Sequence, residues 1–202
     1  MKKFALFLSC LCMVFISTAQ SGISVHAGIS IPVMCYASGN PGNPDAGIAR
    51  PGFYFDIGYT YRLSAFSGVR TLLYYTSNAA GNSLVSSSGA YKIAGWMAGP
   101  TLSSRDGRKW QGSFSPLAGY SRIWTPQLKR NNQPWLYKQA TGCFSWGGEL
   151  MLRYRLNDNS YLRFGAGHLN MKPHLNGFNT ETAKKEQHIV LVNGVAGFGW
   201  QW

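Results

Sequence analysis

The C-terminal stretch, residues 188–202 (HIVLVNGVAGFGWQW), constrains the fold more than any other part of the sequence. Counted back from the end, every second residue is apolar or small: Trp202, Trp200, Phe198, Ala196, Gly194, Val192 and Val190. This period of two predicts a long strand with one broad apolar face. A strand that crosses a bilayer needs about 9–11 residues, an apolar row toward lipid and aromatic residues near the interfaces. The stretch has all three features and therefore predicts a membrane-crossing strand.

The first residues of the chain have the pattern of a secretory signal peptide. Lys2 and Lys3 precede an apolar run from Phe4 to Ile16, and small residues follow it up to Ala19. The run is shorter than the roughly 20 apolar residues of a membrane-spanning helix. We therefore expect residues 1–19 to be cleaved, which leaves residues 20–202 as a single exported domain.

The chain is basic, with 19 Lys and Arg against 7 Asp and Glu and a net charge of +12. Such a balance can indicate nucleic-acid binding. Export excludes that partner, and the basic residues are spread over turns, loops and strands, so an anionic membrane surface is the better match. Only Cys35 and Cys143 follow the signal region, which excludes a disulfide framework. A single bridge between them stays open, and it would need Cα atoms within about 7 Å.

Eight segments alternate between apolar and polar residues, and turn-rich stretches separate them. They are residues 22–36, 52–62, 68–76, 91–102, 110–124, 144–155, 161–170 and 188–202. The phase of residues 91–102 is ambiguous, although Lys92 fits better on the inner face. Pro116 interrupts the fifth segment and predicts a bulge or kink there. This is the weak, repeated signal of a membrane barrel.

The connections alternate strictly in length. Residues 63–67, 103–109 and 156–160 are short, whereas 37–51, 77–89, 125–142 and 171–187 are long. Open sheet edges are not tolerated in hydrocarbon, so the first and last strands should pair and close the sheet. The sequence therefore predicts an all-β fold, a transmembrane antiparallel up-and-down β-barrel of about eight strands. Short turns and both termini are expected in the periplasm, with long loops outside the cell.

Aromatic residues should form two belts, one at each interface. Near the short turns the belt comprises Tyr61, Trp110, Tyr154, Trp200 and Trp202. Near the long loops it comprises Tyr36, Phe53, Tyr75, Tyr91, Trp124 and Phe144. The strand phase also gives a direct test, because Ile57 should face lipid and Gly58 the lumen. Arginine at position 57 is expected to cost about 2–4 kcal/mol at mid-depth, and arginine at position 58 should be better tolerated.

A barrel of about eight strands is filled by its own side chains. The inward positions place two carboxylates among several guanidinium groups: Asp56 and Glu149 with Arg62, Arg70, Arg153, Arg155 and Arg163. Two carboxylates near His26 could act as acid and base in catalysis. We favour a structural interpretation, in which they are the counter-ions of a charged lumen network. The excess of Arg leaves a narrow anion-preferring path as an alternative.

With its signal region, strand number, loop parity and closing strand, the whole mature chain resembles the small eight-stranded outer-membrane proteins, OmpA transmembrane domains and OmpX. In that family the last strand carries an aromatic assembly signal, here Phe198, Trp200 and Trp202. The resemblance implies location in the bacterial outer membrane and insertion by the barrel-assembly machinery. It further implies a monomer with no cofactor and no metal, in contact with outer-membrane lipid and lipopolysaccharide. No peptidoglycan-binding domain is expected after Trp202.

The family supports three functional hypotheses. The leading one is a non-enzymatic barrel that acts through its surface loops, on lipopolysaccharide, host or neighbouring proteins, or in envelope integrity. Candidate lipopolysaccharide contacts are the loop residues Lys129, Arg130, Lys172, Lys184 and Lys185, although solvated loop charges would look the same. The second is a narrow passive pore for small, anionic solutes.

The third hypothesis is a lipid A-modifying enzyme. Deacylase barrels carry a His and a Ser two residues apart, followed by a Glu. Here Asn170 stands at the Ser position relative to His168, and Glu181 lies in a loop. Because the nucleophile is missing, we expect no catalytic site.

Overall fold

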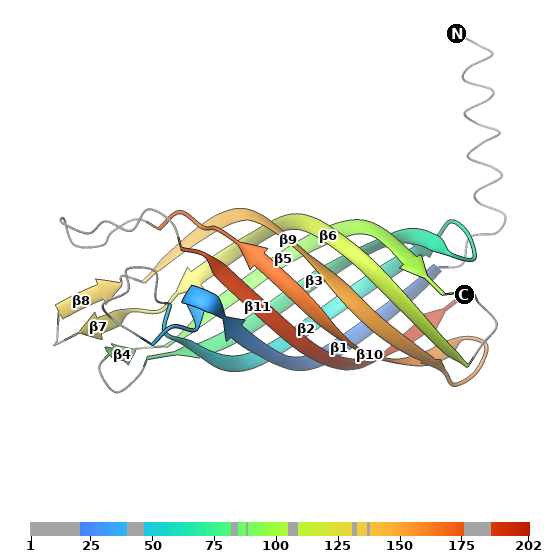
Figure 1. Cartoon of the computed structure of the whole chain (residues 1–202), viewed down its shortest axis with the longest axis horizontal. Coiled ribbons are helices and arrows are strands. Elements are labelled where there is room, and N and C mark those ends of the chain that lie inside the picture. Colours follow the sequence, from blue (N-terminus) through green and yellow to red (C-terminus); the bar gives the residue numbers. More distant parts are fainter. Residues whose placement is uncertain are drawn as a thin grey trace, which may run out of the picture.

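The computed structural model describes residues 21–39, 47–81, 85–87, 89–104, 109–130, 133–136, 138–175 and 187–202. Eight antiparallel strands form a closed barrel (Figure 1). They are β1 (Ser21–Val33), β2 (Ala49–Arg62), β3 (Ser67–Ala80), β5 (Ala90–Ser103), β6 (Trp110–Thr125), β9 (Gln139–Arg155), β10 (Ser160–Met171) and β11 (Ile189–Gln201). The predicted fold class and strand number are confirmed. Within this described part, no helix is long and apolar enough to cross a membrane.

The first and last barrel strands close the sheet. β1 pairs antiparallel with β11 from Gly22 opposite Gln201 to Val33 opposite Val190. Beyond this ladder, the N–H of Ser21 donates to the carbonyl of Trp202 (3.1 Å), and the N–H of Trp202 donates to the carbonyl of Ser21 (2.9 Å). The final residue thus completes the closure, because its main chain satisfies both groups of its partner.

The two ends of the barrel differ. At one end, here called the short-turn end, residues 63–66, 104–109 and 156–159 connect neighbouring strands, and Trp202 lies there (Figure 1). At the other, the long-loop end, the short strands β4 (Val85–Ser87), β7 (Leu128–Arg130) and β8 (Gln133–Leu136) form a separate three-stranded sheet beyond the barrel. The 3-10 helix η1 (Met34–Tyr36) caps β1 at this end, where the sequence predicted more strand.

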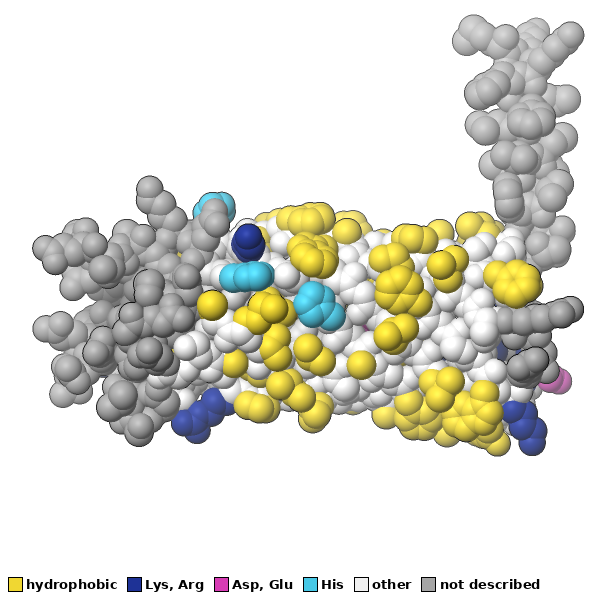
Figure 2. Space-filling view, viewed as in Figure 1, with side chains coloured by type: hydrophobic (Ala, Val, Ile, Leu, Met, Phe, Trp, Pro, Cys, Tyr) yellow, Lys and Arg dark blue, Asp and Glu magenta, His cyan; other side chains and the backbone are white. Residues whose placement is uncertain are grey.

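The barrel exterior is apolar, as a lipid-facing wall requires. Large apolar side chains on alternate positions stay exposed in the monomer, among them Leu73, Phe144, Leu150 and Trp200. Figure 2 shows apolar side chains over the middle of the visible face, with Lys and Arg toward its ends. An apolar surface of this extent is stable only in a membrane.

Two details of the predicted phase and belts are wrong. Lys92 is exposed and shares the outer face of β5 with Trp96 instead of facing the lumen. It is paired with Trp124 near the long-loop end, where a long side chain reaches the interface. Tyr36 and Tyr91 do not belong to the outer aromatic belt, because both are fully buried inside the barrel mouth. Their rings meet edge to face with centroids 5.2 Å apart.

The ladder between β5 and β6 is interrupted at a pair of prolines. Pairing runs from Lys92 opposite Trp124 to Ala98 opposite Ala118 and resumes at Leu102 opposite Phe114 in the same register, so Pro100 stands opposite Pro116. The bulge expected at Pro116 is therefore absent. Neither proline has an N–H, so the gap leaves no amide donor at these two positions exposed to lipid. On the lumen side, the hydroxyl of Ser115 donates to Thr101 Oγ1 (2.8 Å) and bridges the interruption.

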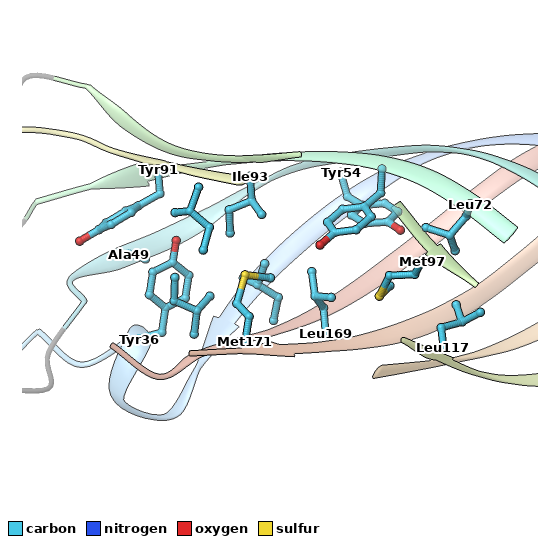
Figure 3. Packing of buried hydrophobic residues seen from close by; sticks show 14 of the residues in the cluster. Tyr36, Ala49, Tyr54, Leu72, Tyr91, Ile93, Met97, Leu117, Leu169 and Met171 are labelled. Carbon is cyan, nitrogen blue, oxygen red and sulfur yellow. The ribbon is translucent and has the colours of Figure 1, made fainter. Parts of the chain in front are cut away.

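The core of the protein lies inside the barrel. Buried apolar side chains fill the lumen from the long-loop end to about its middle, including Tyr36, Tyr91, Ile93, Met171, Tyr54 and Leu72 (Figure 3). The rings of Tyr54 and Tyr74 stack with centroids 6.4 Å apart. Farther toward the short-turn end the inward residues become polar and charged. The charged residues of the lumen therefore lie toward the short-turn end, whereas apolar side chains mixed with uncharged polar ones such as Ser30 and Asn78 fill the rest.

Candidate functional site: the charged lumen and the long-loop surface

Arg70 on β3 is the centre of the lumen charge network. Its side chain is completely buried, because residue 70 faces the lumen. Nε donates to Glu149 Oε2 of β9 at 2.5 Å, and Nη2 lies 3.8 Å from Asp56 Oδ1 of β2. Two carboxylates from different strands thus compensate one guanidinium group, which is the condition for keeping a charge inside a protein.

Polar neighbours at four other positions extend the network. His26 Nδ1 lies 2.7 Å from Asp56 Oδ1, where an Nδ1–H donates to the carboxylate. Arg70 Nη1 donates to Ser24 Oγ (3.4 Å) and Thr60 Oγ1 (3.3 Å). Arg163 Nη1 also donates to Ser24 Oγ, at 3.4 Å. His26 and both carboxylates are almost fully buried. That they act as a structural network and not in catalysis stays a prediction.

Gly58 lies directly beside this network. A Cβ atom at this position would stand 2.6 Å from both Nη1 and Nη2 of Arg70. An arginine at position 58 would therefore displace the end of the Arg70 side chain and bring a like charge beside it. That it is better tolerated than arginine at position 57 stays a prediction.

The remaining predicted lumen arginines lie nearer the short-turn end and are part-buried. Arg62 Nη2 donates to Gln111 Oε1 (2.7 Å), and Arg153 Nη2 donates to Gln201 Oε1 (2.5 Å). The guanidinium of Arg153 also lies over the ring of Tyr161, 4.2 Å from its centroid. Arg155 is part-buried at the end of β9. The sequence did not predict the amides Gln111 and Gln201 as partners of these arginines. Which side chains meet across the lumen depends on how far the neighbouring strands are offset along the barrel.

The candidate lipopolysaccharide contacts are only partly described. Lys129 is exposed on β7 of the outer sheet, and Lys172 is exposed just after β10. The backbone of Arg130 belongs to β7, but its side chain, with the whole of Lys184 and Lys185, lies outside the described part. Phe198, Trp200 and Trp202 are exposed on the outer face of the barrel at its short-turn end.

The residues considered for lipid A deacylation are only partly described. His168 lies on the outer wall with its ring edge on Trp146 (centroids 5.8 Å apart). Asn170 Oδ1 accepts a 2.9 Å hydrogen bond from His188 Nε2. Glu181 lies outside the described residues. Cys35 and Cys143 are both free thiols. In the ranges described above, no three His, Cys, Asp or Glu residues are grouped as metal ligands.

These features define the class of the fold: a closed, eight-stranded, membrane-spanning barrel with a packed lumen, as found in small outer-membrane proteins. No protein-family model and no curated protein sequence matches the chain.

Solved structures with this fold include Ail, the attachment invasion locus protein of Yersinia pestis, with 16% identity over 91% of this chain and 99% of that chain and a TM-score of 0.54. OprG of Pseudomonas aeruginosa has 15% identity over 90% and 96% of the two chains, with a TM-score of 0.55. Neisserial surface protein A has 12% identity over 90% and 95%, with a TM-score of 0.52. At such low identities the likeness shows the fold.

Proposed function

We propose that the chain is a non-enzymatic outer-membrane protein whose barrel is a scaffold for the structures at its long-loop end. In this proposal the signal peptide directs export, the short-turn end and both termini face the periplasm, and the long-loop end faces outward. The barrel-assembly machinery would act on the strand that ends in Phe198, Trp200 and Trp202. The protein would work as a monomer and without a cofactor.

The observation that carries the proposal is the filled lumen. Arg70, Glu149 and Asp56 form a buried charged layer, and a cluster of apolar side chains closes the lumen above it. The cavities beside these residues measure only about 40 Å³ and 10 Å³. A space of about 10–15 Å³ holds a single water molecule, so the smaller one offers no continuous path for solutes. This packing argues against the narrow-pore hypothesis.

The second support is the structure outside the barrel. The chain builds an additional sheet from β4, β7 and β8 at the long-loop end, and an ordered surface of this kind is suited to contacts with other molecules. Lys129 is exposed on that sheet, and Lys172 is exposed directly after β10 at the barrel rim. Ammonium groups near an anionic surface each contribute about 1 kcal/mol. We propose that they contact lipopolysaccharide phosphates, together with Arg130, Lys184 and Lys185.

The enzyme hypothesis loses support for a geometric reason. A His acts as a general base only within hydrogen-bond reach of a nucleophile. His168 instead contacts Trp146 on the outer wall, and the neighbouring outward position is Asn170 bonded to His188. In this proposal, the surface partners other than lipid are host proteins or neighbouring proteins.

Two measurements test the proposal. The refolded mature chain should give no stepwise conductance in planar bilayers and should leave lipid A with all its acyl chains; either activity would overturn it. In detergent, Lys129→Glu and Lys172→Glu should each weaken lipopolysaccharide binding by about fivefold. Lys109→Glu is the matched control, because Lys109 is exposed at the short-turn end and should leave binding unchanged. An equal loss in all three variants would place the contact elsewhere.

A further inference from the structure

The outer wall of the barrel carries two neighbouring cations near the long-loop end, one on β5 and one on β6. Lys92 of β5 is exposed and lies opposite Trp124 of β6, and Arg122, two positions before Trp124, is exposed on the same outer face. Diagonal neighbours of this kind are about 7–8 Å apart, within reach of long side chains. We call the outward residues Lys92, Tyr120, Arg122 and Trp124 the basic wall patch. Neither cation is among the candidate lipopolysaccharide contacts of the loops.

The guanidinium of Arg122 is held over an aromatic ring and has small neighbours. Its Cζ atom lies 5.6 Å from the ring centroid of Trp124. Arg122 is paired with Ala94 of β5 on one side and with Gly142 of β9 on the other. The N–H donors of the guanidinium stay available for a ligand, because the contact with the ring uses none of them.

Gly142 makes room for a hydroxyl group beside this guanidinium. Tyr120 is paired with Phe144, but its ring reaches over Gly142, where an added Cβ atom would overlap the phenol oxygen. Because Gly142 is the β9 partner of Arg122, the hydroxyl of Tyr120 lies next to Arg122 on the wall. The basic wall patch therefore joins a guanidinium, an ammonium and a phenol, all of which can donate hydrogen bonds.

No side-chain carboxylate of the described residues compensates these two cations. Asp56 and Glu149 are buried in the lumen, and Asp158 lies in a turn at the opposite end of the barrel. Two like charges on a lipid-facing wall are costly unless an anion is shared between them. The charge of the basic wall patch therefore favours an anionic ligand.

The surroundings of the basic wall patch indicate what kind of anion this is. Phe144 and Trp124 are exposed beside the cations, and exposed aromatic rings are typical of the level of the lipid headgroups. Toward the middle of the barrel the wall continues with Trp96 and Trp146, which are 51% and 50% exposed. A molecule with an anionic head and hydrocarbon chains would contact both parts of this wall.

We propose that the basic wall patch binds the phosphate group of one lipid molecule, whose hydrocarbon chains lie along the wall below it. A phosphate offers paired oxygens to the guanidinium fork, negative charge to the ammonium and an acceptor to the phenol. The identity of the lipid rests on the proposed function: with the long-loop end outward, it is lipopolysaccharide. The inference deepens that function by adding a contact on the barrel wall that needs no loop residue.

The test measures binding of lipid A to the full mature chain, refolded in a zwitterionic detergent, by native mass spectrometry. Lipid A with its phosphates is compared with lipid A from which they have been removed. The phosphorylated form should bind about tenfold more tightly, and about 10 mM inorganic phosphate should leave most of it bound. Equal affinities of the two forms would overturn the proposal. Complete displacement by inorganic phosphate would also overturn it, because the site would then need no lipid.

Charge-removing variants assign the binding to the basic wall patch. Arg122→Gln and Lys92→Gln should each weaken the binding of phosphorylated lipid A by about tenfold. Arg50→Gln is the matched control and should bind like the parent chain. Arg50 is exposed at the same end of the barrel, on β2, which pairs with neither β5 nor β6. Heat-dependent gel migration checks that each variant is folded, and unchanged binding in either folded wall variant would refute the site.

Two further variants test the phenol without removing a charge. Tyr120→Phe removes only the hydroxyl and should weaken binding by about threefold. Gly142→Ala should have a similar effect, because the new Cβ atom forces the Tyr120 hydroxyl away from Arg122. Parent-like binding in both variants would exclude the phenol from the site and contradict the proposed geometry.

The loop variants separate this site from the loop contact of the proposed function. Loss of binding in Lys129→Glu and Lys172→Glu, with parent-like binding in Arg122→Gln and Lys92→Gln, would refute the wall site and support the loop contact. The reverse result would support the wall site and refute the loop contact. Losses in both groups of variants would support both contacts.

Discussion

Replacement of Glu149 by Gln tests whether the buried charge network holds the barrel together. The substitution keeps the length of the side chain and one acceptor oxygen but removes the carboxylate that lies 2.5 Å from Arg70 Nε. Breaking a buried ion pair from one side costs about 3–5 kcal/mol, because the partner charge stays buried without compensation. Asp56, 3.8 Å from Arg70 Nη2, still compensates part of that charge. We therefore expect the lower limit, about 3 kcal/mol, which is about a hundredfold in the unfolding constant.

The assay is equilibrium urea unfolding of the chain in lipid vesicles, followed by tryptophan fluorescence. Asp158→Asn is the control, because Asp158 is an exposed carboxylate in the turn 156–159 and should change the free energy of unfolding by less than about 0.5 kcal/mol. The double variant Arg70→Met with Glu149→Leu should regain most of the loss, since it removes both charges. A cost below about 1 kcal/mol for Glu149→Gln, or a double variant no more stable than the single one, would refute the reasoning.

Three further outcomes are expected. Ile57→Arg on the lipid face should cost about 2–4 kcal/mol in the same unfolding assay, whereas Ile57→Leu should cost less than about 1.5 kcal/mol; equal values would mean that this face is not in lipid. Deletion of Trp202 removes two main-chain bonds to Ser21 and should slow the appearance of the heat-resistant folded species on gels, and an unchanged rate would separate closure from this residue. Burial, and to a smaller extent Tyr91, raises the pKa of Tyr36 well above its usual range, so the folded state keeps a proton that the unfolded chain loses above about pH 10. The free energy of unfolding should therefore fall as the pH rises above about 10, and Tyr36→Phe should remove that part of the slope.

Much of the fold could be predicted from the local alternation of apolar and polar residues. Segments such as Phe53 to Tyr61 place an aromatic or branched residue at every second position, and their phase was predicted correctly. Residues 91–102 gave no such contrast, because Ala94, Gly95, Ala98 and Gly99 make both faces small. The single charge, Lys92, then decided the phase, and it did so wrongly because a lysine near a strand end can extend to the interface.

The loop sheet and the ion-pair geometry were beyond a sequence argument. β4, β7 and β8 span three or four residues each, too short for a period of two to be visible. The sequence indicated that arginines and carboxylates share the lumen. It did not indicate that Arg70 meets Glu149, 79 residues away, because that choice depends on the stagger of all eight strands.

The facing prolines of β5 and β6 have a mechanical consequence for the whole cylinder. A closed barrel is expected to open where the pairing between two neighbouring strands is interrupted. The pairing of the described barrel strands is interrupted at two places, and the one at Ala49 to Gly52 lies at the very end of β2. The other, at Pro100 and Pro116, lies within the wall and is bridged by the side chains of Ser115 and Thr101. We therefore expect a heated or mechanically pulled barrel to open first between β5 and β6, and not between β1 and β11, whose pairing is uninterrupted.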